Sequence, residues 1–244
     1  MHPAEVIFAA IAVLGGAYVR GYSGFGSSLF WISSLSLVLP PAEVIPTVFM
    51  LEVAASVRLL PKVWRDIDWR SLRWLLLGTL ITTPPGIYLL ATVPAAPIRV
   101  AISVVVLTAT VLLWQGFSLK RMPGPTPTVL TGLLCGLLNG STGIAGPPAI
   151  LFFFSSPAAA TVSRASIIAF FLGTDSYGTA VAATQGLVTA DVLMRTALLL
   201  PVVLTGIALG NRRFIRTEPE AFRRFALLLL ALLSVAVFLR ALLG

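Results

Sequence analysis

The chain has 244 residues, of which 57% are hydrophobic and 11% are charged, and its formal net charge is +8. A soluble domain carries roughly 25% charged residues, and a soluble monomer of this composition would lack the polar side chains needed to cover its surface. The composition therefore excludes a soluble enzyme, a disordered tail and a disulfide scaffold, and it indicates a membrane protein with several spans.

Rare residue types exclude further classes of site. His2 is the only histidine and Cys135 the only cysteine, so a His-based metal centre, a thiolate metal site and a disulfide are not expected. No cofactor is indicated, and without an HExxH motif or a plausible Ser–base pair the chain is not expected to be an enzyme. The basic residues lie in short loops between apolar runs, a placement that orients membrane helices and does not indicate a nucleic-acid partner.

Apolar runs long enough to cross a bilayer follow one another along the chain. A crossing needs about 20 residues, and only a helix satisfies the backbone groups within such a segment. The runs cover residues 43–60, 71–91, 97–118, 161–182, 191–210 and 221–243.

Two regions, 4–39 and 127–155, do not fit one helix per crossing. The first is interrupted by GYSGFGSS at 21–28, and the second by NGSTGIAGPP at 139–148. The remaining pieces have the length of re-entrant or half-membrane helices. Each region is therefore predicted to form a helix hairpin whose Gly-rich tip lies inside the protein.

The two breaks resemble each other at an offset of 119 residues, close to half of the chain. Gly21 aligns with Gly140, Ser23 with Thr142, Gly24 with Gly143, and Arg20 with Asn139. Chance similarity between Gly-rich breaks is the alternative. The repeat predicts two halves, residues 1–122 and 123–244, each made of one broken hairpin and three spans.

Loop charges predict how these halves are oriented. Basic residues gather after the first long span of the first half, at Arg58, Lys62, Arg65, Arg70 and Arg73, and the matching loop of the second half has only Arg195 nearby. The next pair of loops reverses this bias, with Arg99 alone at 92–99 and five arginines at 211–224. The excess of basic residues on the cytoplasmic side then places Lys120, Arg121 and Arg164 in the cytoplasm. The prediction is an all-α polytopic membrane protein of two inverted repeats, an architecture typical of secondary transporters.

At these motifs the chain resembles the sulfite exporter TauE/SafE family of membrane transporters. GYSGFGSSLF and GLLNGSTGIAGPPAILFF are similar to its paired Gly-rich signatures, one near the start of each half. Ser27 and Ser28 stand where more glycine is expected in the first motif. The resemblance implies transport of sulfur-containing anions such as sulfite, sulfonates and thiosulfate across the cytoplasmic membrane.

The tips are the predicted anion site. A helix that restarts after a break presents unpaired N–H groups and the positive end of its dipole, which bind oxyanions. Glycines let a ligand approach the backbone, and serine or threonine hydroxyls add donors; close helix packing is the alternative role for these small residues. The candidate substrate-binding residues are Arg20, Gly21, Ser23, Gly24, Phe25, Gly26, Ser27, Asn139, Gly140, Ser141, Thr142, Gly143, Gly146 and Pro147.

Three charged residues at predicted membrane depth carry separate expectations. The planar fork of Arg20 suits an oxyanion, unless the tip reaches the headgroups and Arg20 lies there. Glu52 and Asp175 are intramembrane carboxylates and therefore candidates for carrying a coupling proton. The alternatives are that Glu52 pairs with Arg20 or hydrogen-bonds as a neutral acid, and that Asp175 does the same with Ser176 or Tyr177.

The sequence as a whole predicts a secondary transporter of the inner cell membrane that works by alternating access. Its expected partners are a small sulfur-containing anion, a coupling proton and membrane lipid, and a homodimer is left open. An anion channel of the same fold and a structural subunit of a larger complex are the competing hypotheses.

Overall fold

The computed structural model describes residues 3–35, 39–94, 111, 121–214 and 228. This part of the chain is helical and contains no strand, which confirms the predicted all-α class. The elements are α1 (Pro3–Ser23), α2 (Ser27–Leu35), α3 (Pro41–Val63), the 3-10 turn η1 (Trp64–Asp66), α4 (Trp69–Thr92), α6 (Pro125–Thr142), α7 (Gly146–Ser155), α8 (Ala160–Thr184) and α9 (Ala190–Phe214).

The chain is a multi-pass membrane protein. Three segments of the described chain are long and apolar enough to cross a bilayer, namely Pro41–Asp66, Trp69–Thr92 and Ala190–Phe214. They contain the predicted spans 43–60, 71–91 and 191–210. The predicted span 161–182 lies within α8, which has a sufficient length of 25 residues but carries Arg164 and Asp175. The spans predicted at 97–118 and 221–243 fall outside the described residues.

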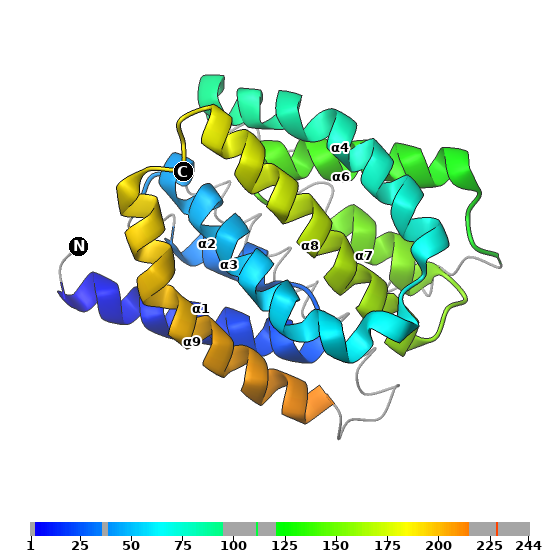
Figure 1. Cartoon of the computed structure of the whole chain (residues 1–244), viewed down its shortest axis with the longest axis horizontal. Coiled ribbons are helices and arrows are strands. Elements are labelled where there is room, and N and C mark those ends of the chain that lie inside the picture. The colour runs from blue at the N-terminus through cyan, green and yellow to red at the C-terminus, as the bar shows by residue number, and fades with distance from the viewer. Residues whose placement is uncertain (1–2, 36–38, 95–110, 112–120, 215–227, 229–244) are drawn as a thin grey trace.

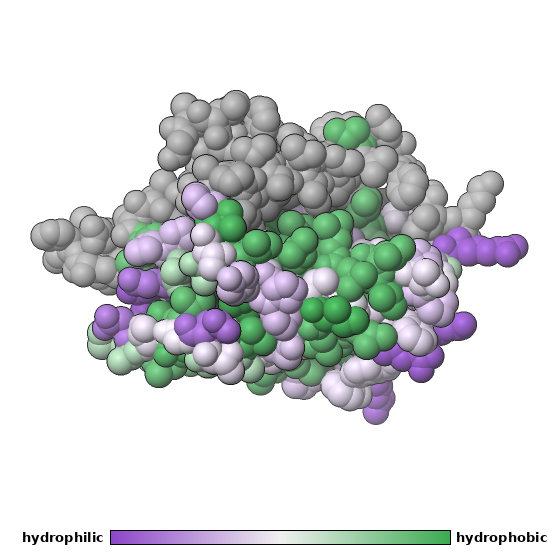
Figure 2. Space-filling view, turned by 90° about the horizontal axis from the view of Figure 1, so that it is seen from above, coloured by the Kyte–Doolittle hydropathy of each residue, from purple (hydrophilic) through white to green (hydrophobic). Residues whose placement is uncertain are grey.

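The exposed surface accounts for the high share of hydrophobic residues. Figure 2 shows hydrophobic side chains gathered across the middle of one face and hydrophilic residues toward its two ends. Large apolar side chains are exposed on the outer helices, including Ile81 at 58% and Tyr88 at 62% on α4, and Leu198 at 71% on α9. In water such a band would be a costly apolar patch, whereas in a bilayer it faces lipid tails.

The helices are arranged around a central antiparallel pair. In Figure 1, α3 and α8 lie side by side in the middle, α4 packs with α6 on one flank, and α1 packs with α9 on the other. Phe49 of α3 lies against Gly178 of α8, while Asp68 N, between η1 and α4, donates to Ser166 Oγ near the start of α8 at 2.9 Å. Each outer pair joins a helix of the predicted first half to one of the predicted second half. The division into two inverted repeats stays a prediction, and this antiparallel packing supports it.

Both predicted hairpins are broken where the sequence indicates. The α1 helix ends at Ser23 and α2 begins at Ser27, and α6 ends at Thr142 and α7 begins at Gly146. Both pairs of boundaries are separated by the 119 residues of the sequence repeat. The indole nitrogen of Trp31 donates to Val13 O at 3.0 Å, so α2 folds back along α1.

Glycines allow the outer helices to approach closely. A methyl group added at Gly132 would collide with the carbonyl oxygen of Leu75, and one added at Gly210 would collide with Tyr18 O. The hydroxyl of Thr79 lies 3.1 Å from Gly132 O and links α4 to α6. Without a hydrophobic driving force between helices in lipid, such close contact and interhelical hydrogen bonds hold the pairs together.

We expect Gly132→Ala to destabilise the protein, because the added Cβ overpacks the contact between α4 and α6. Overpacking costs about 1–3 kcal/mol, and a chain of this size loses roughly 2–4 °C in its unfolding midpoint per kcal/mol. Thermal unfolding of the purified protein in detergent measures the shift. Gly124→Ala is the control, since a Cβ there meets no atom within 4 Å. Equal midpoints for the two variants would contradict the proposed contact.

Candidate functional site at the hairpin tips

The two hairpin tips lie inside the protein. Every residue from 20 to 29 is buried, and so is every residue from 138 to 150. The α3 residues that contact the first tip, Glu52 and Ser56, stand near the middle of that helix. The tips therefore meet the central helix pair far from the helix ends.

Glycine is required at one matching position of each tip. Gly24 has φ 82° and Gly143 has φ 71°, in the left-handed region that side-chain-bearing residues avoid. Each terminates its helix with the same hydrogen bond, from Gly24 N to Arg20 O at 2.8 Å and from Gly143 N to Asn139 O at 2.7 Å. The two helices therefore end in the same C-terminal geometry.

Arg20 is the charged centre of the first tip. Its side chain is 0% exposed, and its Nε forms an ion pair with Glu52 Oε2 at 3.1 Å. Its terminal nitrogens donate to Gly24 O and, at 2.8 Å, to Ser56 Oγ. Glu52 also accepts a hydrogen bond from Ser27 Oγ through its second oxygen. Of the alternatives that the sequence left open, the pairing of Glu52 with Arg20 is confirmed, and the placement of Arg20 among headgroups is wrong.

The second tip holds a neutral amide in the matching place. Asn139 Nδ2 donates to Asp175 Oδ1 at 3.2 Å, and both side chains are buried. The alternative pairing of Asp175 with Ser176 or Tyr177 is not what the structure shows, since Asn139 is its hydrogen-bond partner and Ser176 is exposed. Asp175 also lies within electrostatic range of Glu52 and Arg20, so both tips contribute to one polar centre.

The two tips use the same internal spacing for these contacts. Arg20 reaches Ser56, 36 residues further along the chain, and Asn139 reaches Asp175, also 36 residues further along. The position that matches Glu52 at the offset of 119 residues is Phe171. The guanidinium of Arg20 lies over the Phe171 ring at 4.6 Å from its centroid, a cation–π contact.

Most of the predicted hydroxyl donors bond to their own backbone. Ser141 Oγ donates to Leu137 O at 2.7 Å, and Thr142 Oγ1 donates to Leu138 O at 2.6 Å. The hydroxyl of Ser23 lies 2.7 Å from Phe25 O and 2.8 Å from Val19 O. In this conformation the three hydroxyl hydrogens are therefore already used within the tips.

The remaining predicted residues line or support the tips. Gly21 packs against the backbone of Ile207 on α9, and Gly140 packs against Thr83 on α4, so both serve close helix packing. The ring of Phe25 stacks edge-on with Phe154 of α7 at 5.5 Å. Gly26 has φ 88° and completes the first turn, and Gly146 with Pro147 begins α7 in a buried first turn.

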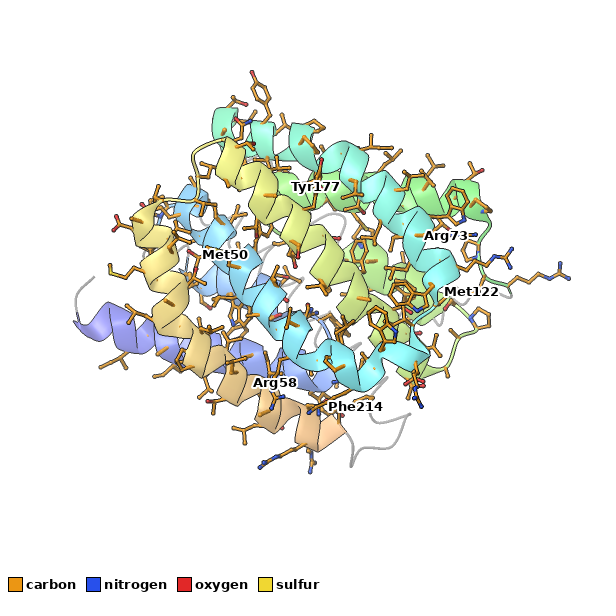
Figure 3. All side chains as sticks on the ribbon, in the orientation of Figure 1. Met50, Arg58, Arg73, Met122, Tyr177 and Phe214 are labelled. Atoms are coloured by element: carbon orange, nitrogen blue, oxygen red, sulfur yellow. The ribbon has the colours of Figure 1, made fainter. Side chains whose placement is uncertain are left out.

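Sequence reasoning missed Arg164, which it placed in the cytoplasm as one of several loop residues. The side chain is buried, and its Nη2 donates to Gly21 O at 2.6 Å and to Asn211 Oδ1 at 3.1 Å. Its Nε donates to Tyr22 O at 3.1 Å, so one guanidinium satisfies the carbonyl end of α1. The guanidinium lies 3.9 Å from the ring centroid of Phe214, which Figure 3 labels on α9.

The internal repeat contains a signal for Arg164. Its counterpart at the offset of 119 residues is Ile45, which is buried. Arg164 lies against Gly24 of the first tip, and Ile45 lies against Gly143 of the second. An arginine at a position that the other half uses for an apolar core residue indicates a buried cation.

Comparison with known proteins places these observations in a family. The family model described as "Sulfite exporter TauE/SafE" matches residues 8–237. A curated relative from Cupriavidus necator (strain H16), named "Probable sulfite/organosulfonate exporter TauE", is 30% identical over 226 residues, covering 88% of this chain and 87% of the relative. No solved structure matches significantly.

We expect removal of either partner of the buried ion pair to destabilise the protein strongly. Removing one partner of such a pair leaves an uncompensated charge and costs about 3–5 kcal/mol, so Arg20→Ala and Glu52→Ala should each lower the unfolding midpoint markedly. The double variant should lose less than the two single losses together, because it leaves no unpaired charge. Thermal unfolding in detergent provides the measurement.

The ion pair of Arg195 with Glu43, 2.9 Å long and with the Glu43 side chain 41% exposed, supplies the matched control. Glu43→Ala should cost no more than about 1 kcal/mol, as is usual for exposed pairs. Equal losses for Glu43→Ala and Glu52→Ala would show that burial of the Arg20 pair carries no energetic weight.

Proposed function

Because the chain belongs to the sulfite exporter TauE/SafE family, we propose that it is a secondary transporter that moves a small sulfur-containing anion across the cytoplasmic membrane by alternating access. The candidate substrates are sulfite, thiosulfate and an organosulfonate. The name of the Cupriavidus necator relative, a sulfite/organosulfonate exporter, supports this substrate class. The binding site in this proposal is the polar centre between the two hairpin tips.

The observation that carries the proposal is the buried guanidinium of Arg20. A guanidinium binds planar or pyramidal oxyanions through parallel N–H···O hydrogen bonds, which are strong where water is excluded. Arg20 is fully buried, stands at the break of a membrane hairpin and holds a carboxylate, which is itself an oxyanion. The substrate anion replaces Glu52 as the partner of Arg20 in this mechanism.

Two further features favour an anion at this place. The α2 and α7 helices both begin at the tips, where their N-terminal N–H groups and dipoles attract negative charge. Arg164 adds a second buried cation at the first tip, where it bonds Gly21 O. Together they form an electropositive backbone and side-chain environment that does not depend on Arg20 alone.

The present conformation is closed at Arg20, whose side chain has no exposed surface. Alternating access then requires the tips and the central helices to separate on one side of the membrane at a time. The outer pairs α1 with α9 and α4 with α6 each join the two predicted halves, so movement of one half is transmitted to the other. For an anion that moves without a coupling ion, an inside-negative potential favours outward movement by about 2.3 kcal/mol per charge per 100 mV, and movement against that field requires a coupled ion.

A carrier is distinguished from an anion channel by its kinetics. We expect flux of labelled sulfite, thiosulfate or a short alkylsulfonate in proteoliposomes to saturate and to be accelerated by unlabelled substrate on the opposite side. A channel shows neither counter-exchange nor saturation in the same range of concentration. Absence of any flux for all three anions would overturn the transporter proposal itself.

We expect Arg20→Gln to weaken anion binding about 10- to 100-fold, since a hydrogen bond to a charged group contributes about 1.5–3 kcal/mol. Glu52→Gln should strengthen binding, because it removes the carboxylate that competes with the substrate for Arg20. Binding of sulfite, thiosulfate and sulfate to purified protein measures both effects.

The control is Arg195→Gln, which alters an arginine in the partly exposed ion pair with Glu43. It should bind the anions as the parent does. Equal affinities in the Arg20, Glu52 and Arg195 variants would remove Arg20 from the site. Arg20→Gln also lowers stability, so a loss of binding in that variant could come from misfolding. The expected gain of affinity in Glu52→Gln cannot come from misfolding.

A further inference from the structure

Two buried oxygen atoms at the second tip have no hydrogen-bond partner among the described residues. They are Asn139 Oδ1 and Asp175 Oδ2, and they belong to the two side chains already joined by the hydrogen bond from Asn139 Nδ2 to Asp175 Oδ1. Both side chains are more than nine-tenths buried. A buried acceptor without a partner costs free energy, so two of them in one pair of side chains require an explanation.

A single proton accounts for both atoms. A primary amide and a carboxylic acid pair through two hydrogen bonds in a ring, in which the amide N–H donates to one carboxyl oxygen and the carboxyl O–H donates to the amide oxygen. The first of these two bonds is present. If Asp175 carries a proton on Oδ2, that O–H can donate to Asn139 Oδ1, and both oxygen atoms then have a partner.

The charged groups around Asp175 come from several elements. Glu52 from α3 adds a negative charge within electrostatic range, and Arg20 from α1, the cation in that range, is already in the ion pair with Glu52. The α6 helix contributes the neutral Asn139, and α7 has no charged residue. The charged residues Arg70 and Arg73 are exposed in the first turns of α4, and Arg65 and Asp66 of η1 are exposed as well. Arg164, on the same helix as Asp175, binds the carbonyl end of α1. Within the part of the chain that the structure describes, Asp175 thus has no cation of its own.

We propose that Asp175 holds an exchangeable proton, shared with Asn139 in an acid–amide pair, and that this proton crosses the membrane with the substrate anion. The proposal rests on the transporter function above and assigns its coupling. In the loading step, a hydronium ion transfers a proton to the Asp175 carboxylate and leaves as water, and the resulting O–H donates to Asn139 Oδ1. In the reverse step, water on the other side accepts the proton.

The proton changes the charge of the site where the anion binds. With Asp175 ionised, Arg20, Glu52 and Asp175 together carry one net negative charge, which repels an anion. With Asp175 protonated they are neutral, and displacement of Glu52 leaves the positive charge of Arg20 to the substrate. A metal cation is a poorer explanation, because hard cations take six or more oxygen ligands and two are offered here.

Infrared difference spectroscopy of the purified full chain tests the protonation directly. A protonated carboxyl group gives a C=O stretch that a carboxylate lacks. We expect this band at neutral pH in the parent, its loss in Asp175→Asn, its shift in Asn139→Ala, and its persistence in Glu52→Gln. The surface variant Asp191→Asn is the matched control and should keep the band, since Asp191 is exposed at the start of α9. Absence of the band from the parent, or its loss in Glu52→Gln and not in Asp175→Asn, would overturn the assignment.

Proteoliposomes with an internal pH dye test the coupling. The substrate is a short alkylsulfonate, which stays ionised at neutral pH, so any proton that moves with it is carried by the protein. We expect proton movement with the parent and with Asp191→Asn, and movement at the level of protein-free liposomes with Asp175→Asn. Sulfonate flux without proton movement in the parent, proton movement that persists in Asp175→Asn, or a dependence on sodium in place of pH would each refute the coupling and leave the transporter intact. Absence of sulfonate flux from the parent would count against both coupling to this anion and the transporter proposal, whereas the infrared bands would still decide where the proton resides.

Discussion

The structure depends on one constraint: a charged side chain buried inside a membrane protein needs an opposite charge or hydrogen-bond partners beside it. Arg20 satisfies it with Glu52, Ser56 and the carbonyl of Gly24, and Arg164 satisfies it with the carbonyl end of α1 and Asn211. Neither guanidinium reaches solvent. Because such pairs gain less from their attraction than desolvation costs unless their geometry is good, a protein has little reason to bury them for stability alone. The place of Arg20 at the hairpin tip agrees with the proposed anion site.

The two tips share a backbone and differ in charge. Their helix boundaries, terminal glycines and 36-residue side-chain contacts correspond. At the corresponding places, however, the first tip has arginine, serine and a neighbouring glutamate, and the second has asparagine, aspartate and phenylalanine. In the proposed mechanism, the first tip presents a fixed positive charge and the second tip presents a group that takes up a proton. The residues that the two tips share form the turn, and the proposed roles fall on residues that differ between them.

The positions of the two hairpin breaks could be predicted from the sequence, but most of the side-chain contacts made by the tips could not. Glycine clusters at 21–28 and 139–148 interrupt apolar runs, and that local signal placed both breaks, because backbone geometry is decided locally. Pairing of Glu52 with Arg20 was among the expectations because both residues stood at membrane depth. The bond between Asn139 and Asp175 and the cap that Arg164 forms on α1 join residues that are 36 and more than 140 positions apart. Such contacts depend on how α6, α8 and α1 pack against one another, and a single sequence does not specify that packing.

The single thiol of the chain has a practical consequence. Cys135 lies fully buried in α6, beside the glycines that pack against α4. Modifying reagents act on exposed thiolates, so the native protein offers them no target and serves as its own unlabelled background. Cysteines introduced one at a time at exposed positions such as Arg65 or Gln185 then report which side of the bilayer each loop faces. The molecule is thus suited, without prior removal of cysteines, to chemical mapping of its orientation and of the surfaces that open and close during a transport cycle.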